Sequence, residues 1–214
     1  MKKAIIISTF LGIIIVFFNT QIAFAQSLPR SINLNVPFQA QAPFGNWALP
    51  YSEACEDASI IMVDHYLRKV GLSKQQMKSE IDQMVAWEKK HGGWTPNMSV
   101  ERVVQVAKAF YNYKLEIISN LTINKIKTEL ALGHPVIVPT AGRKLGNLNF
   151  RPPGPLYHMI VIKGYTASGY FITNDPGTHK GADYLYGQTR LINAVHDWTG
   201  TSPTGPKIGL IMYQ

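Results

Sequence analysis

Cys55 is the only cysteine in the chain, and it directly precedes a stretch with the spacing of an amphipathic helix. A single thiol makes no internal disulfide, so its chemistry is the first property to test. A helix amino terminus and a neighbouring imidazolium both lower the pKa of a thiol and convert it into a strong nucleophile. A buried, inert thiol that packs like a small apolar residue is the alternative interpretation. We therefore treat Cys55 as a candidate nucleophile.

A nucleophilic cysteine needs a base that takes its proton and later delivers it to the leaving group, and histidine does this best near neutral pH. Among the six histidines, His158 stands out because it opens an apolar strand pattern directly after a proline-rich loop. His65 lies about 15 Å along the predicted helix from Cys55, too far to reach the thiol. The histidines in turns and at helix ends are expected to be structural, namely His91, His134 and His196.

Strand parity supplies a carboxylate partner for His158. If Tyr165 and Tyr170 face each other across the turn between them, His158 and Asp175 share one face of the sheet. A carboxylate there fixes the imidazole tautomer and leaves the other ring nitrogen for sulfur. A single bulge would instead bring Asn174 to that face, and the segment around Asp175 also fits an ordinary turn.

An acyl-transfer site also needs hydrogen-bond donors for the oxyanion that forms on the substrate carbonyl. The backbone N–H of Cys55 at a helix start is one donor, and a glutamine side chain is a suitable second. Gln39 and Gln41 lie two positions apart, so they share a face of an extended segment. The spacing alone does not choose between them.

Acidic residues around Cys55 work against this chemistry. Glu53, Glu56 and Asp57 flank the thiol in sequence, and nearby carboxylates raise the pKa of a thiol. If these side chains point away from the site, they only complement the positive end of the helix dipole.

Residues 1–25 have the pattern of an export signal, which leaves residues 26–214 as one folded domain. Two lysines open the chain, residues 4–18 are apolar and uncharged, and residues 23–25 supply a small-x-small cleavage pattern. An uncleaved membrane anchor is the alternative. No later segment is apolar enough to span a membrane, so the protein is expected to be secreted or held at the cell envelope. An idle thiol is unusual in such a protein.

Helical patterns come first in the folded domain and strand patterns second. Ser73 and Gln76 form a capping box that begins the second helix, whose predicted apolar face consists of Met77, Ile81, Met84 and Val85. The order indicates an α+β fold in which a helical part packs on an antiparallel sheet with a cleft between them. The sequence predicts helices at 55–71, 73–90, 99–110, 122–132 and 191–198, and strands at 32–36, 115–118, 135–139, 158–165, 170–175 and 208–213.

The formal net charge is +8 at pH 7, of which the two lysines of the signal contribute two units. This charge suits an anionic surface such as a cell envelope. The lysines are scattered and no aromatic nucleic-acid motif occurs, so nucleic acid is not an expected partner. No His-x-x-x-His pair or cysteine cluster occurs, so no metal or other cofactor is expected. A structural ion between Asp175 and Asp183 stays open.

Six segments carry a resemblance to a known family. They are Val36–Phe38, Gln41–Trp47, Glu53–Cys55, Tyr157–Val161, Gly164–Tyr165 and Asn174–Gly177. Together they resemble the bacterial papain-like cysteine peptidases related to the bacteriocin double-glycine leader peptidases, over residues 33 to about 200. The resemblance implies that Cys55 is the nucleophile, His158 the general base, Asp175 its orienter and Gln41 the oxyanion donor.

Two features depart from the family pattern. The gap from Gln41 to Cys55 is longer than usual, which keeps Gln39 open, and Glu56 stands where a glycine often follows the cysteine. The resemblance implies a papain-like fold and a thiol hydrolase that cleaves peptides or proteins through an acyl-enzyme. Two alternatives stay open: the same residues acting on a cell-wall peptide or amide, or transferring an acyl group to an amine, and a peptide-binding module without turnover. Trp47, Trp87 and Trp94 would line the cleft of such a module, and a core role for each is the other interpretation.

Overall fold

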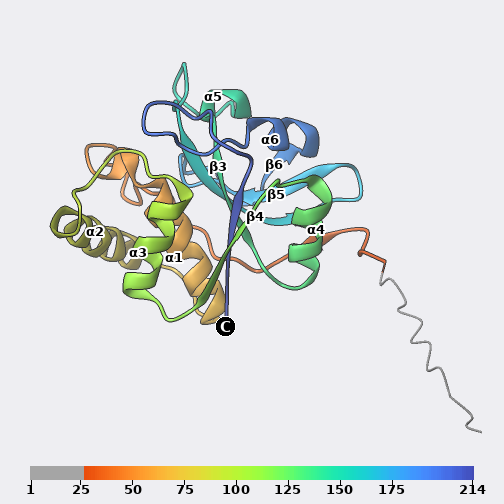
Figure 1. Ribbon diagram of the computed structural model, residues 1–214, viewed down its shortest axis with the longest axis horizontal. Coiled ribbons are helices and arrows are strands. Elements are labelled where there is room, and N and C mark those ends of the chain that lie inside the picture. The colour runs from red at the N-terminus through yellow and green to blue at the C-terminus, as the bar shows by residue number, and fades with distance from the viewer. Residues whose placement is uncertain (1–26) are drawn as a thin grey trace, which may run out of the picture.

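Helices and strands form two parts in the computed structural model, which describes residues 27–214 (Figure 1). The predicted export signal at residues 1–25 lies outside the described residues. Among residues 27–214, no helix has the length and apolar character needed to cross a bilayer. The helical elements are η1 (Tyr51–Glu53), α1 (Cys55–Leu67), α2 (Lys74–Lys90), α3 (Val100–Phe110), α4 (Ile123–Ala131), α5 (Gly142–Leu145) and α6 (Gln188–Ala194).

The strands pair antiparallel in the order β2-β7-β3-β4-β5-β6, with β1 paired to β4. They are β1 (Ile32–Asn33), β2 (Lys114–Ile118), β3 (Val136–Thr140), β4 (His158–Tyr165), β5 (Tyr170–Asn174), β6 (Tyr184–Gly187) and β7 (Gly209–Tyr213). Helices α1–α3 lie to one side of this sheet in Figure 1 and α4–α6 to the other. The predicted α+β fold is confirmed.

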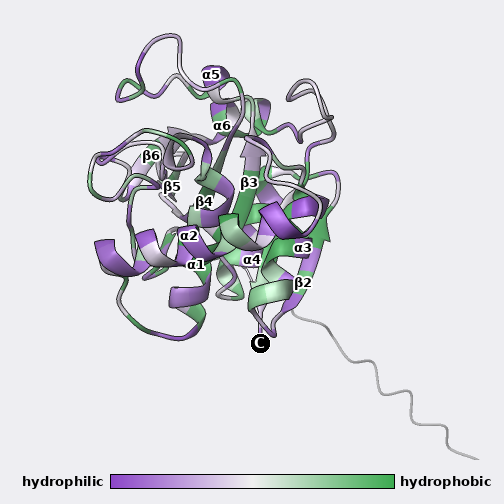
Figure 2. Ribbon diagram, turned by 90° about the vertical axis from the view of Figure 1, so that its left-hand side faces the viewer, coloured by the Kyte–Doolittle hydropathy of each residue, from purple (hydrophilic) through white to green (hydrophobic). Residues whose placement is uncertain are grey.

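The central strands are buried on both faces. Met159 and Val161 of β4 belong to the core formed with α1–α3, whereas Ile160 and Ile162 belong to the core formed with α4 and α6. Because successive side chains point to opposite faces, a strand between two helical layers must be apolar at every position. Figure 2 shows the resulting contrast between the hydrophobic central strands and the hydrophilic α2.

Helix α1 was predicted to be amphipathic and to reach residue 71, and both expectations are wrong. The helix packs against β4, α2 and α3, so its residues from Cys55 to His65 are all buried. It ends at Leu67 because Lys69 adopts a left-handed backbone (φ 58°) and the chain turns away there. Burial on all sides forces the acidic residues of α1 to find partners inside the protein.

Two helix starts follow the sequence signals closely. The Ser73 hydroxyl accepts from the Gln76 N–H at 3.2 Å, and the Gln76 side chain accepts from the Ser73 N–H at 2.9 Å. Ser99 likewise caps α3 by accepting from the Arg102 N–H. The predicted apolar face of α2 is buried, and it consists of Met77, Ile81, Met84 and Val85.

The hairpin of β4 and β5 contains a bulge that the sequence did not reveal. Tyr165 lies opposite Phe171 instead of Tyr170, but the register shifts between Ile162 and Gly164. Past this shift the pairing returns to the predicted register, so the end of β4 faces the end of β5 as expected. Strand β1 covers the shifted segment closely, since a Cβ on Gly164 would lie 2.2 Å from the backbone oxygen of Ile32.

Three short elements were not predicted, among them the 3-10 helix η1, and one helix was misplaced. Strand β6 has only four residues, and α5 is a single turn that closes at Gly146 in a left-handed conformation (φ 63°). Helix α6 begins at Gln188 without a side-chain cap, so no start signal marks it. It ends at Ala194 because Val195 bridges to Thr140 of β3.

Candidate active site

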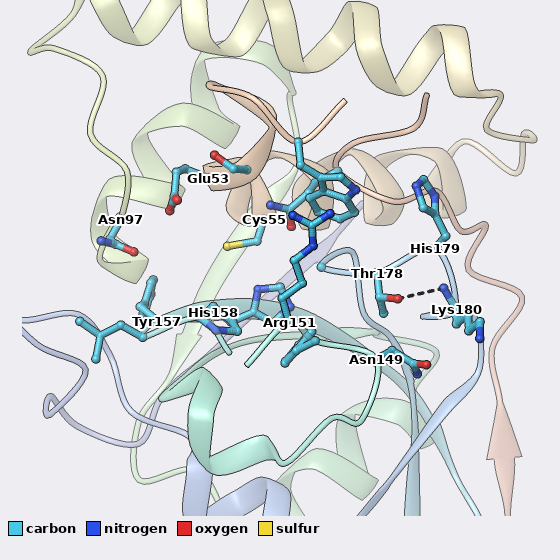
Figure 3. Close-up of a pocket in the computed structure, with 17 residues that line it drawn as sticks. Glu53, Cys55, Asn97, Asn149, Arg151, Tyr157, His158, Thr178, His179 and Lys180 are labelled. Atoms are coloured by element: carbon cyan, nitrogen blue, oxygen red, sulfur yellow. Dashed lines mark hydrogen bonds between the residues drawn. The ribbon is translucent and has the colours of Figure 1, made fainter. Parts of the chain in front are cut away.

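Cys55 is the first residue of α1 and lines a cavity of about 700 Å³ between the helical part and the sheet (Figure 3). Its side chain is 5% exposed. The backbone N–H of Met159 on β4 acts to lower the pKa of the thiol. His158 precedes Met159 and lines the same cavity. The structure therefore brings the predicted nucleophile and the predicted base to one site.

Asp175 holds His158 from the sheet side. The His158 Nε2 lies 2.7 Å from Oδ1 of Asp175, which leaves Nδ1 as the free ring nitrogen. The carboxylate is 0% exposed. Burial alone would raise the pKa of Asp175, but His158 and three hydrogen bonds to the carboxylate keep the pKa below its usual value. Asp175 is thus an anion that fixes the imidazole tautomer.

Two residues that the sequence did not single out support Asp175. The Tyr186 hydroxyl donates to Oδ2 at 2.6 Å, and the Asn147 amide donates to the same oxygen at 2.9 Å. Burial and the adjacent carboxylate raise the pKa of Tyr186, so its hydroxyl keeps the proton that it donates. The alternation of Tyr184, Leu185 and Tyr186 was the available signal for β6, and Asn147 lies in an irregular loop that offered none.

Glu56 contacts the thiol directly. The Cys55 Sγ donates to Glu56 Oε2 at 2.9 Å, and Glu56 Oε1 accepts from the Met98 N–H at 2.9 Å. Burial, followed by Glu56, raises the pKa of Cys55 well above its usual value. Glu56 therefore opposes formation of the thiolate, which is one of the two roles predicted for the acidic residues around Cys55. Asp57 is instead buried near Glu88 of α2, and burial, followed by that carboxyl group, raises the pKa of Asp57.

The two candidate glutamines are separated by the structure. Gln41 lines the cavity and donates from Nε2 to the Tyr51 carbonyl at 2.9 Å. Gln39 donates to the Leu72 carbonyl at 3.0 Å and is not a lining residue of the cavity. An amide has two N–H donors, so Gln41 has one that the contact with Tyr51 does not use. Only Gln41 is placed to meet a substrate oxyanion.

The other histidines have separate partners. His65 lies 2.8 Å from both the Gly71 carbonyl and Glu80, and His134 lies 3.0 Å from Glu129. His91 and His196 each contact a backbone carbonyl. The sequence reasoning overlooked His179, which lines the cavity with its ring 5.7 Å from Trp47.

One group of described residues has metal-ligand geometry, namely Asp64, His65 and Glu80. Its ligand atoms already have protein partners, because Asp64 pairs with Arg68 and His65 bridges Gly71 and Glu80. Asp175 and Asp183 also have separate partners, and Asp183 pairs with Lys163 at 2.7 Å. These contacts satisfy both sets without an ion.

The charges that line the cavity are unevenly distributed. Arg151, His179 and Lys180 lie on one side of Cys55 in Figure 3, and Glu53 and Asn97 lie on the other. Among residues 27–214, neither Arg151 nor Lys180 forms an ion pair within 4 Å. The cavity is therefore polarised along its length.

Of the three tryptophans considered for a binding cleft, one lines the cavity. Trp47 is at its wall. Trp87 and Trp94 pack against the core of the helical part, and Trp87 also stacks on His91 at 4.4 Å between ring centroids. Only Trp47 of these three residues therefore contributes an indole ring to the cavity wall.

Comparison with known proteins gives one family match and several structural ones. The sequence model of Peptidase_C39_2, the Peptidase_C39 like family, matches residues 33–203. A solved structure assigned as a C39-like peptidase from Bacillus anthracis has a TM-score of 0.58 and 18% identity, covering 86% of this chain and 98% of that chain. This likeness confirms the predicted papain-like fold.

A second solved structure, xylellain, is described as a cysteine protease from Xylella fastidiosa. It has a TM-score of 0.47 and 12% identity, and the match covers 88% of this chain and 87% of that one. This score is too low to support an argument. No match was found among curated proteins.

Proposed function

Because the chain belongs to the Peptidase_C39 like family of cysteine peptidase-like hydrolases, we propose that it is an exported peptidase that cleaves peptide bonds through an acyl-enzyme on Cys55. The observation that carries this proposal is the 2.7 Å contact of His158 with Asp175 at the wall of the cavity that Cys55 lines. The export signal pattern of residues 1–25 supports the location.

In the proposed first step, His158 Nδ1 takes the thiol proton and the sulfur attacks the substrate carbonyl. A C–S bond forms while the carbonyl π electrons move to oxygen. The backbone N–H of Cys55 and the amide of Gln41 donate to that oxyanion. The tetrahedral species then collapses, the C–N bond breaks, and His158 delivers its proton to the leaving amine. Water, activated by His158, hydrolyses the thioester.

Asp175 has an electrostatic role in this scheme. Imidazolium forms transiently beside it, and a buried carboxylate 2.7 Å away stabilises that cation. Tyr186 and Asn147 keep the carboxylate from rotating, because both donate to its second oxygen. The ring therefore presents Nδ1 to the sulfur throughout the cycle.

The cavity supports a peptide as the substrate. It is open to solvent, has both polar and apolar side chains in its wall, and has space for several substrate side chains at about 700 Å³. A cell-wall peptide is a second candidate, favoured by the basic side chains of Arg151 and Lys180 at one end, which attract carboxylates.

The test compares the wild type with Cys55→Ala and His158→Ala on a peptide library and on purified cell wall, with products identified by mass spectrometry. We expect each variant to lose at least about a thousandfold in kcat, and the acyl-enzyme of the wild type to be trapped by acid quench. The substrate class is identified by whether products arise from the peptide library or from the cell wall. Equal product from wild type and Cys55→Ala would remove Cys55 from the mechanism.

A further inference from the structure

Glu56 is a buried carboxyl group that the mechanism above leaves unused, although it touches the reacting sulfur. It is 1% exposed. One of its oxygens accepts from the Cys55 thiol and the other from the Met98 N–H, both at 2.9 Å. Tyr157 fixes the same loop from the other side by donating to the Met98 carbonyl at 2.8 Å. The carboxyl group is thus held against the sulfur by the fold.

The groups that face Glu56 come from every surrounding element. Cys55 and Asp57 of α1 and Tyr157 and His158 beside β4 interact with Glu56 itself. Behind them lie Glu53 of η1 near Cys55, Asp197 near Tyr157 and Glu88 of α2 near Asp57. His158 is the only group in this set that becomes a cation, and Asp175 already binds it. Burial raises the pKa of Glu56 to about 7, although the thiol and the Met98 N–H act to lower it.

The contact between thiol and carboxylate has opposite effects in the two ionisation states of Glu56. As a carboxylate, Glu56 accepts the S–H bond and repels a negative sulfur at 2.9 Å. As a neutral acid, its O–H can donate to the sulfur, and a donor to the charged form stabilises the thiolate. The same geometry therefore favours the thiol in one state and the thiolate in the other.

We propose that Glu56 controls the nucleophile: as a carboxylate it keeps the proton on Cys55, and only its neutral form permits the thiolate–imidazolium pair that attacks the substrate. This proposal rests on the proposed function of Cys55 and His158. It explains why an acidic residue follows the cysteine, since the resting thiol is kept in its unreactive form.

Activation of the site takes up one proton from solvent. The resting site contains the Glu56 carboxylate, the Cys55 thiol and a neutral His158. One proton from solvent is taken up at Glu56, and the S–H proton moves to Nδ1 of His158. The activated site then contains neutral Glu56, the thiolate and imidazolium. One S–H bond is broken, and one O–H bond and one N–H bond are formed.

The sign of the pH dependence follows from this uptake. The activated population requires one more proton than the resting one, so it falls as pH rises above about 7. Between pH 7 and pH 8 the activated fraction falls about fivefold, because a group with a pKa of about 7 is half protonated at pH 7 and about one-eleventh protonated at pH 8. An ordinary thiol shows the opposite trend, since its thiolate fraction only rises with pH.

The experiment measures the Cys55 thiolate without any substrate. Because the chain has one cysteine, the thiolate ultraviolet absorbance, with Cys55→Ala as blank, and the rate of iodoacetamide alkylation both report this residue alone. For the wild type we expect both signals to fall from pH 6 to pH 8. In Glu56→Gln the amide oxygen still accepts from Met98, and the amide N–H faces the sulfur at every pH. We expect this variant to keep its thiolate at pH 8 and to be alkylated there about ten times faster than the wild type.

Glu116→Gln is the matched control, because it makes the same chemical change at an exposed position of β2. Its profiles should overlay those of the wild type. Two results together would overturn the proposal: the wild-type thiolate signal rises steadily with pH, and the Glu56→Gln variant shows the same rise. The role of Glu56 would then be limited to its hydrogen bond with Met98. Circular dichroism confirms that the variants are folded. Failure of the proposed hydrolase function would be distinguishable, because thiolate control would persist while no peptide was cleaved.

Discussion

The Tyr186 hydroxyl donates to Oδ2 of Asp175 at 2.6 Å, while Oδ1 of the same carboxylate contacts His158. Tyr186 is on β6 and Asp175 directly follows β5, so the edge of the sheet determines how the imidazole is held. The orientation of the predicted base therefore depends on a strand that makes no contact with the sulfur.

Tyr186→Phe should retain the packing of the ring and remove the hydroxyl, which donates to Asp175 and accepts from the Asn147 amide at 2.8 Å. A bond to a buried charged group contributes about 1.5–3 kcal/mol to stability, so we expect a loss of that size in the free energy of unfolding. The kcat should also fall, because Asp175 would hold the imidazolium less firmly. Denaturant unfolding and steady-state kinetics measure the two effects. Tyr184→Phe is the control, and equal losses in both variants would contradict the assignment.

Gln41→Ala should lower kcat by about 10²–10³-fold, which is the usual cost of removing one oxyanion donor. Gln39→Ala is the matched control, because Gln39 is also a glutamine of this segment but donates to Leu72. It should leave kcat within about twofold of the wild type while lowering stability slightly. The reverse order of the two kcat values would transfer the donor role to Gln39.

Arg151→Glu should change which peptides are cleaved. The basic end of the cavity favours substrates with an acidic side chain near Arg151, and a partly solvated ion pair contributes up to about 1 kcal/mol. We therefore expect the ratio of kcat/KM for acidic over basic peptides to fall roughly fivefold. Lys108→Glu on α3 makes the same change in net charge at an exposed position. A similar fall in that variant would show that overall charge, and not the cavity, selects the peptide.

Glu56 should make the protein less stable as pH rises. Its pKa is raised from 4.5 to about 7 on folding, so between these values the folded state binds more protons than the unfolded state, and stability falls with increasing pH. The 2.5-unit difference corresponds to about 3 kcal/mol once pH exceeds 7.

Glu56→Gln has no carboxyl group to titrate at this position. Its free energy of unfolding, relative to the wild type, should therefore improve steadily from pH 4 to pH 8, as measured by urea denaturation. Glu116→Gln should show no such trend. Parallel stability curves for Glu56→Gln and the wild type would mean that Glu56 ionises in the folded state as readily as in the unfolded one.

Much of the fold was predictable where a local signal coincided with a structural need. The capping box of Ser73 specified where α2 begins, and the apolar run after His158 specified β4 because both faces of that strand are buried. The sequence also predicted that His158 and Asp175 share a face of the sheet. That prediction assumed that Tyr165 pairs with Tyr170, which is wrong, but the bulge in β4 restores the predicted register beyond the turn.

The remainder depended on contacts between distant segments. Asn147 and Tyr186 acquire their roles only when a loop and an edge strand meet at Asp175. The acidic neighbours of Cys55 were noted from sequence, but which of them faces the sulfur depends on how α1 is rotated between β4 and α2. No spacing rule gives that rotation for a helix that is buried on all sides. The catalytic roles themselves stay predictions until the variants are assayed.

The bulge in β4 determines the chemical type of the group that orients His158. Lys163 is the extra residue between the two registers. If Lys163 were instead paired in the register of Tyr165 and Phe171, the parity along β4 would reverse, and Asn174 would share the face of His158 in place of Asp175. Asn174 now points the other way and binds the backbone oxygens of Val36 and Pro37. The register shift at Lys163 therefore decides whether a carboxylate or an uncharged amide lies beside the imidazole, without altering either side chain.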